Sequence, residues 1–221
     1  MMVNVYIPGL GQRMDRCVKY VDSFKKHGKE LLIVDMEKLT LGKNFSLDSV
    51  FSEIERLSDG EKIEYLVGYS MGGAIAIDYT DKNPGKVDKL ILIDPLVTKI
   101  TNFPMAFRKL MSDDKDAVRK GLKAESKYKI NMFFKPDFVN FMLKEARIIP
   151  QIKTLGNSFK IDNKTFFLWA KDDLLCPVVG YDNVKGYFSD KELILIEEGG
   201  HQWALETEKL DHYIGMILEK Y

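Results

Sequence analysis

Residues 65–80 of the chain read YLVGYSMGGAIAIDYT, and this stretch decides the fold. Residues 65–68 suit a buried strand, and a segment with the composition of a helix follows at once. Between them Ser70 lies in a Gly-x-Ser-x-Gly motif with Gly68 and Gly72. Such a tight turn strains the serine backbone and requires residues without bulk two positions before and after it. The motif predicts that the Ser70 hydroxyl projects above a sheet at a helix N-terminus, beside the Met71 amide.

The rest of the chain repeats this order of strand and then helix. Short β-branched or aliphatic runs are bounded by turn or polar residues, and they lack the polar alternation of strands that face water. Strands that alternate with helices predict a parallel sheet covered on both faces. We expect strands at residues 3–7, 31–35, 65–68, 90–93, 166–170 and 193–196, and helices at residues 14–27, 47–57, 71–80 and 206–219.

The alternation stops after Asp94-Pro95. About 70 residues pass before the next strand, which is far longer than an ordinary crossover. Several stretches in this interval resemble helices, with prolines between them. We therefore predict an inserted helical cap at residues 96–159, on a core formed by residues 1–95 and 160–221.

The composition limits the classes of function. The 221 residues suffice for one sizeable core, and 33 basic residues balance 33 acidic ones. No net charge exists to attract nucleic acid or an anionic membrane surface, so neither is an expected partner. Two cysteines and three widely separated histidines show no metal-ligand spacing. We expect no metal and no cofactor.

The start of the chain predicts a first core strand. Residues 1–7 lack a basic leader and a long apolar stretch, and Pro8-Gly9 ends the run within one strand length. No other run approaches the roughly 18 apolar residues needed to cross a bilayer. The expectation is a soluble, cytoplasmic protein, and the oligomeric state is not indicated.

A serine nucleophile needs a base, which is usually a histidine held by a carboxylate. His201 follows the last predicted strand through Glu197-Glu198-Gly199-Gly200, which places it at the same edge of the sheet as Ser70. His27 precedes a glycine at the end of a helical segment, where a structural role is expected. His212 lies inside the final helix, where a surface or packing role is expected.

The acid is expected on another loop at this edge. The loop that leaves the strand at residues 166–170 begins Lys171-Asp172-Asp173 and continues to Pro177. Either aspartate gives the order serine, acid, histidine along the chain. Aspartates are also common in solvated turns, but the position of this loop favours a role for at least one of them. Asp94, at the end of the fourth strand, is a fallback.

These features together resemble the α/β-hydrolase superfamily, and specifically its esterases and lipases with a helical cap. Residues 68–73 resemble the nucleophile elbow, residues 170–177 the acid loop, and residues 199–201 the histidine loop. Matching the acid loop position by position implies that Asp173 is the acid. The resemblance also implies a second oxyanion-hole amide at Leu10, next to that of Met71.

The same resemblance implies a trimmed α/β-hydrolase fold. A mostly parallel sheet of six strands is expected in the order 2-1-3-4-5-6, with helices on both faces. Two positions depart from the family pattern, because Pro8-Gly9 stands where many relatives have His-Gly, and Ala170 stands where glycine is usual. Neither departure removes a catalytic group.

The expected activity is hydrolysis of carboxylic esters with small to medium apolar acyl groups, through an acyl-enzyme on Ser70. The predicted cap is rich in aromatic and methionine side chains, most of which should bury the cap and a minority of which should line the pocket. Thioesterase, peptidase and carbon–carbon bond hydrolase activity stay open as alternatives. The apolar cap residues are Phe103, Met105, Phe107, Leu110, Met111, Met132, Phe133, Phe134, Phe138, Phe141 and Met142.

Two further interpretations compete with catalysis. Gly9-Leu10-Gly11 after the first strand and Asp35 at the end of the second are features of a dinucleotide-binding Rossmann domain. However, Met14 occupies the third glycine position, where a side chain would obstruct helix–strand packing. The other interpretation keeps the hydrolase fold for a ligand-binding protein without activity.

Overall fold

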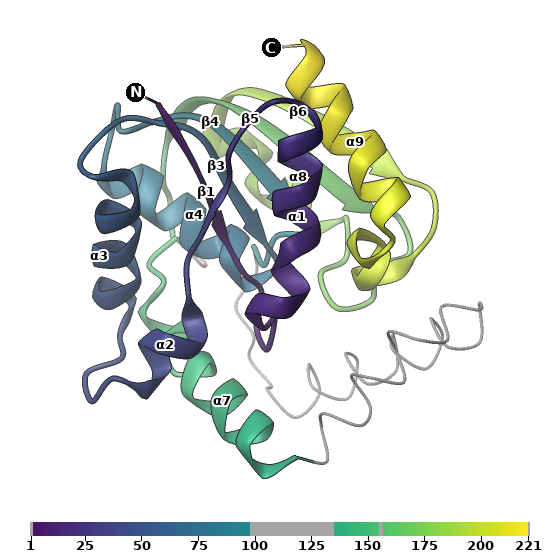
Figure 1. Cartoon of the computed structure of the whole chain (residues 1–221). Helices are drawn as coiled ribbons and strands as arrows, with labels where there is room; N and C mark the ends of the chain where they lie inside the picture. Colours follow the sequence, from purple (N-terminus) through teal and green to yellow (C-terminus); the bar gives the residue numbers. More distant parts are fainter. Residues whose placement is uncertain (1, 98–134, 155–156, 221) are drawn as a thin grey trace.

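The core of the computed structural model, which describes residues 2–97, 135–154 and 157–220, is a six-stranded sheet (Figure 1). Its order is β2-β1-β3-β4-β5-β6, and each neighbouring pair runs parallel. The predicted fold class and strand order are confirmed. The strands are β1 (Val3–Ile7), β2 (Leu32–Ile33), β3 (Ile63–Tyr69), β4 (Val87–Ile93), β5 (Ile161–Ala170) and β6 (Phe188–Ile196).

Helices cover both faces of this sheet (Figure 1). One face packs against α3, α4 and α8, and the other against α1 and α9. Consecutive side chains of a strand therefore enter different layers: Leu66 of β3 joins the first core, whereas Tyr65 and Val67 join the second. The helices are α1 (Met14–Lys26), α2 (Met36–Leu41), α3 (Leu47–Ser58), α4 (Met71–Lys82), α7 (Pro136–Ala146), α8 (Gly180–Val184) and α9 (Thr207–Lys220).

Strands β5 and β6 begin earlier than the apolar runs predict. Their first halves carry polar residues, among them Lys164 and Asp190, which are partners in the ladder and form an ion pair of 2.9 Å. The apolar run forms the second half of each strand, which is fully buried in β5 and partly buried in β6, the edge strand. A search for apolar runs therefore detects the buried half and misses the solvated half.

The second strand is shorter than predicted. Asp35 does not end β2 but caps α2, because its Oδ1 accepts a hydrogen bond of 2.9 Å from the Lys38 amide. Its carboxylate is thus engaged in holding a helix start. The placement of Asp35 that favoured a dinucleotide site is wrong.

The predicted cap is described in part. Helix α7 starts with Pro136, whose fixed φ suits a first helical position, and the 3-10 helix η1 (Ile149–Gln151) follows it. The amides of Lys153 and Thr154 both donate to Asp78 Oδ1 of α4 at 3.1 Å, which ties this segment to the core. Residues 98–134 and 155–156 of the predicted cap, among them its apolar residues from 103 to 134, lie outside the described residues. The cap boundaries stay a prediction.

Among the described helices, none combines the length and the apolar character that a bilayer crossing requires.

Candidate active site

The turn between β3 and α4 has the strained geometry that the sequence requires. Ser70 has φ 53° and ψ −116°, a conformation that residues with a side chain rarely adopt. A Cβ at Gly68 would lie 2.5 Å from the carbonyl oxygen of Gly72, and a Cβ at Gly72 would lie 2.1 Å from that of Ile7. Both glycines are therefore required sterically, and the turn presents Ser70 at the N-terminus of α4.

Gly72→Ala should destabilise the protein because its methyl group would collide with the β1 backbone. We expect a loss of about 1–3 kcal/mol or more in the free energy of unfolding, measured by denaturant titration. Gly186→Ala is the matched control, since a Cβ there meets nothing within 4 Å. Equal stability of the two variants would contradict this account of the turn.

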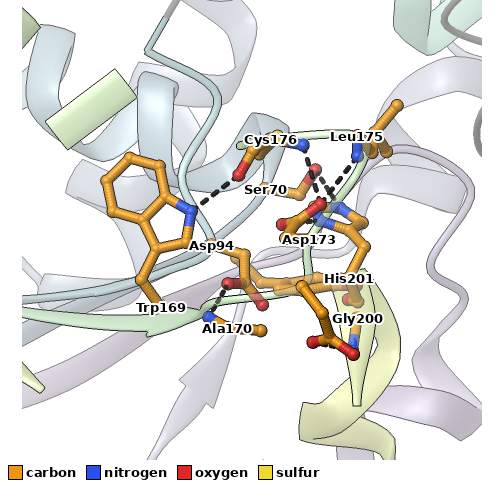
Figure 2. Close-up of polar contacts among 11 residues, drawn as sticks. Ser70, Asp94, Trp169, Ala170, Asp173, Leu175, Cys176, Gly200 and His201 are labelled. Atoms are coloured by element: carbon orange, nitrogen blue, oxygen red, sulfur yellow. Dashed lines mark hydrogen bonds and ion pairs between the residues drawn. The ribbon is translucent and has the colours of Figure 1, made fainter. Parts of the chain in front are cut away.

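Three predicted residues form one hydrogen-bonded chain (Figure 2). His201 Nε2 lies 2.9 Å from Ser70 Oγ, and His201 Nδ1 lies 2.7 Å from Asp173 Oδ2. All three side chains are buried. A carboxylate can only accept hydrogen bonds, so Nδ1 carries the proton of a neutral ring and Nε2 is left to accept from the serine hydroxyl. This is the arrangement in which an imidazole can remove a proton from a serine.

The acid loop after β5 is built around the Asp173 carboxylate. Its Oδ1 accepts hydrogen bonds of 2.8 Å from the amides of Leu175 and Cys176. Trp169 fixes the far side of the loop by donating to the Cys176 carbonyl at 2.6 Å, as Figure 2 shows. The loop therefore presents Oδ2 to His201 in a fixed orientation. Of the two adjacent aspartates, Asp173 is the one in contact with the imidazole.

Asp172 binds the loop that leads to His201. Its two oxygens accept hydrogen bonds from the amides of Gly200, at 2.8 Å, and Gly199, at 3.3 Å. Both glycines have positive φ, and they lead directly to His201. The interpretation of Asp172 as a solvated turn residue is thus wrong, because it holds the histidine loop against the acid loop.

Tyr69 also orients the histidine. Its hydroxyl donates to the His201 carbonyl at 2.5 Å, and the two rings stack with centroids 5.2 Å apart. Tyr69 is the variable residue before Ser70 in the motif, where its identity carries no family signal. Nothing in the sequence pattern singles it out.

Asp94 lies beneath this site without contacting the imidazole. Burial, and then the negative charge of Asp173, raises the pKa of Asp94 well above its usual range. Its Oδ1 accepts a hydrogen bond of 2.8 Å from the Ala170 amide at the end of β5 (Figure 2). Asp94 therefore braces the strand from which the acid loop leaves.

Two backbone amides near Ser70 are available for a ligand. Met71 is the first residue of α4, and Leu10 lies in the loop after β1. Within the described part of the chain, neither amide has a hydrogen-bond partner. That loop touches the turn directly, since a Cβ on Gly9 would lie 3.2 Å from Ser70 Cβ.

The same site holds the one group of described side chains whose ligand atoms lie close enough to share a metal ion. These are Asp173, Cys176 and His201, with ligand atoms within 4.8 Å of one another. Both ring nitrogens of His201 and both oxygens of Asp173 already have hydrogen-bond partners. An ion would have to displace those bonds.

Known sequences share part of this chain. The family model described as serine aminopeptidase, S33, matches residues 47–153. The abhydrolase domain-containing protein lid-1 of Caenorhabditis elegans is 30% identical over 103 residues, covering 41% of this chain and 28% of that protein. The AB hydrolase superfamily protein YisY of Bacillus subtilis is 28% identical over 174 residues, covering 69% and 65%. The chain thus spans less than two thirds of each relative.

Solved structures share the whole fold. A variant of the meta-cleavage product hydrolase of Pseudomonas fluorescens matches with a TM-score of 0.70 at 18% identity, covering 99% of this chain and 90% of that one. A carboxylesterase of Nitrososphaera gargenis matches with a TM-score of 0.66 at 18% identity, covering 99% and 91%. The sheet, the elbow and these likenesses define an α/β-hydrolase fold. In sequence, the chain is similar to members of the α/β-hydrolase superfamily over the segments matched above.

Proposed function

We propose that the chain is a serine hydrolase that cleaves carboxylic esters with small to medium apolar acyl groups. The observation that carries this proposal is the buried hydrogen-bonded chain from Ser70 through His201 to Asp173. Three separate loops supply its members, and each loop is fixed by its own hydrogen bonds. Such a constellation activates a hydroxyl that is otherwise a weak nucleophile.

In the proposed mechanism Ser70 Oγ attacks the carbonyl carbon of the ester while His201 Nε2 takes the hydroxyl proton. The resulting oxyanion accepts hydrogen bonds from the Leu10 and Met71 amides. The imidazolium then protonates the departing alcohol, which leaves an acyl group on Ser70. A water molecule, deprotonated by the same histidine, attacks this acyl-enzyme; the imidazolium then returns the proton to Ser70 Oγ as the carboxylic acid leaves.

The preference for apolar acyl groups rests on the composition of the predicted cap. Within the described residues, Phe138 and Met142 are buried and Phe141 packs against the core, so these three help to bury the cap. The other apolar residues of the predicted cap, a minority of which are expected to line the pocket, lie outside the described residues. Lack of a cofactor and a cytoplasmic location belong to the same proposal.

A panel of p-nitrophenyl esters graded by acyl length and polarity tests the substrate class. We expect the highest kcat/KM for short to medium apolar chains. The panel should include thioesters, amino-acid amides and carbon–carbon bond substrates, because the matching family model is described as an aminopeptidase and a structural neighbour is a meta-cleavage product hydrolase. Activity confined to charged or sugar-like esters, or to one of these other classes, would overturn the ester assignment.

A further inference from the structure

The loop after β1 contains three consecutive amides, and only the outer two are bound. Gly9 N donates to Gln12 Oε1 at 3.1 Å, and Gly11 N donates to Glu145 Oε2 at 2.6 Å. Among the described residues the Leu10 amide between them has no partner. The Gly9 carbonyl, which shares a peptide plane with the Leu10 amide, accepts a hydrogen bond of 3.0 Å from Gln12 N. Together with the bond of Gly11 N, this holds the peptide planes on both sides of Leu10 and leaves its own N–H available.

Gln12 holds the loop from the core side. Its Oε1 also accepts a hydrogen bond of 2.6 Å from the Tyr6 hydroxyl of β1, so the acceptor is itself fixed. Gln12 and Tyr6 are both buried. The hydrogen bond that holds Gly9 is therefore local in sequence, since Gln12 lies three residues from Gly9.

Helix α7 holds the Gly11 side of the loop through Glu145, which is 134 residues from Gly11 in the sequence. Phe138, Met142 and Glu145 are spaced by four and three residues and so share one face of the helix. A Cβ on Gly11 would lie 3.0 Å from Met142 Cγ and 3.2 Å from Phe138 Cζ. The face of α7 that carries Glu145 therefore lies directly on Gly11.

Burying the carboxyl group of Glu145 at this position costs free energy. It is fully buried, and burial raises the pKa of its carboxyl well above the usual range, with the negative charge of Glu37 as a smaller cause. The hydrogen bond from the Gly11 amide opposes this rise in the pKa of Glu145. Cys17 is a further titratable group near Glu145, and Glu37 is itself paired with Arg13. Within the described residues, Gly11 N is the one hydrogen-bond partner of the carboxyl group. An apolar side chain would cost less to bury.

We propose that Glu145 is a positioning residue, which fixes the Leu10 amide toward the oxyanion by holding Gly11 from helix α7. This inference rests on the proposed function, because it assigns a role to the Leu10 amide in that reaction. In this proposal full turnover requires that α7 packs against the loop after β1, although Glu145 does not contact the substrate.

The test compares Glu145→Met, which keeps volume and removes the acceptor, with Glu145→Gln, whose side-chain oxygen can still accept from Gly11. Loss of one oxyanion donor elsewhere costs about 10²–10³ in kcat, so a misdirected donor should cost about 10–100-fold. We expect this fall in kcat for Glu145→Met, with KM changed by less than about threefold. Glu145→Gln should stay within about threefold of the wild type in kcat.

Lys144→Met is the matched control. Lys144 precedes Glu145 on α7 and donates to the Thr40 carbonyl of α2 at 3.2 Å, so its loss loosens the helix without releasing the loop. Its kcat should stay within about threefold of the wild type. Thermal midpoints of all variants separate loss of fold from loss of turnover.

Several results would overturn the inference while leaving the proposed function intact. These are a folded Glu145→Met enzyme with wild-type kcat, an equal fall in Glu145→Gln, or an equal fall in Lys144→Met. If Glu145→Met does not fold, Glu145→Gln decides, and a loss above about tenfold in the folded protein refutes the role. A wild-type protein that neither hydrolyses esters nor reacts with a fluorophosphonate at Ser70 would instead refute the proposed function and this inference with it.

Discussion

Ser70→Ala should lower hydrolysis of a good p-nitrophenyl ester by at least about 10³-fold in kcat. The change removes the oxygen that is proposed to form the acyl-enzyme, and no other group in the hydrogen-bonded chain from Ser70 to Asp173 is expected to replace it. Residual turnover from the oxyanion amides and from substrate binding should remain above the rate in water. Steady-state kinetics with purified protein measures the effect.

Ser52→Ala provides the control for this variant, because Ser52 is exposed on α3, away from the site. Its kcat should equal that of the wild type. Both variants should unfold at the wild-type temperature within a few degrees, since each removes one hydroxyl group. Unchanged turnover in a folded Ser70→Ala protein would end the serine mechanism.

Asp173→Asn should have the second-largest effect, a fall of about 10³–10⁴-fold in kcat. An amide in this position can donate to Nδ1, which then carries no proton, and the proton moves to Nε2. The histidine would then have no acceptor for the Ser70 proton. Adding acid should not restore turnover, because protonated imidazole cannot act as the base.

Asp172→Asn and Asp94→Asn are the matched comparisons. In Asp172→Asn the new side-chain oxygen can still accept from one of the two glycine amides, so we expect a loss of about tenfold or less. In Asp94→Asn the neutral side chain can keep the bond to Ala170 N, and the effect should be similarly small. A larger loss in Asp172→Asn would place the acid one residue earlier. If Asp94→Asn alone abolished activity, the acid would instead be Asp94, at the end of β4.

The sheet could be predicted from the sequence because the buried ends of its strands consist of runs of apolar residues. Apolar runs such as residues 90–93 and 166–170 lie where helices cover both faces, and the serine motif marked the crossing from strand to helix. The first halves of β5 and β6 carry no such signal, because most of their side chains are polar and not fully buried. Helix α2 was missed because its six residues are too few to display a helical period.

The site was predictable where chemistry restricts the residue type. A serine at an elbow needs a histidine and a carboxylate from loops at one sheet edge; the chain has three histidines, and the expected edge loops carry few of its acidic residues. The supporting residues could not be found in this way. Tyr69 and Glu145 act through contacts of 132 and 134 residues in sequence separation, and neither contact leaves a pattern in the sequence.

Reaction with a fluorophosphonate probe, followed by peptide mapping, tests the central claim most directly. The probe forms a covalent bond only with a serine that a neighbouring base activates, and its phosphoryl oxygen occupies the oxyanion position. We predict a single adduct on the peptide that contains Ser70, absent from Ser70→Ala and strongly slowed in His201→Ala. A folded wild-type protein that carries no adduct, or that carries it on another residue, would contradict the assignment of Ser70 as the nucleophile.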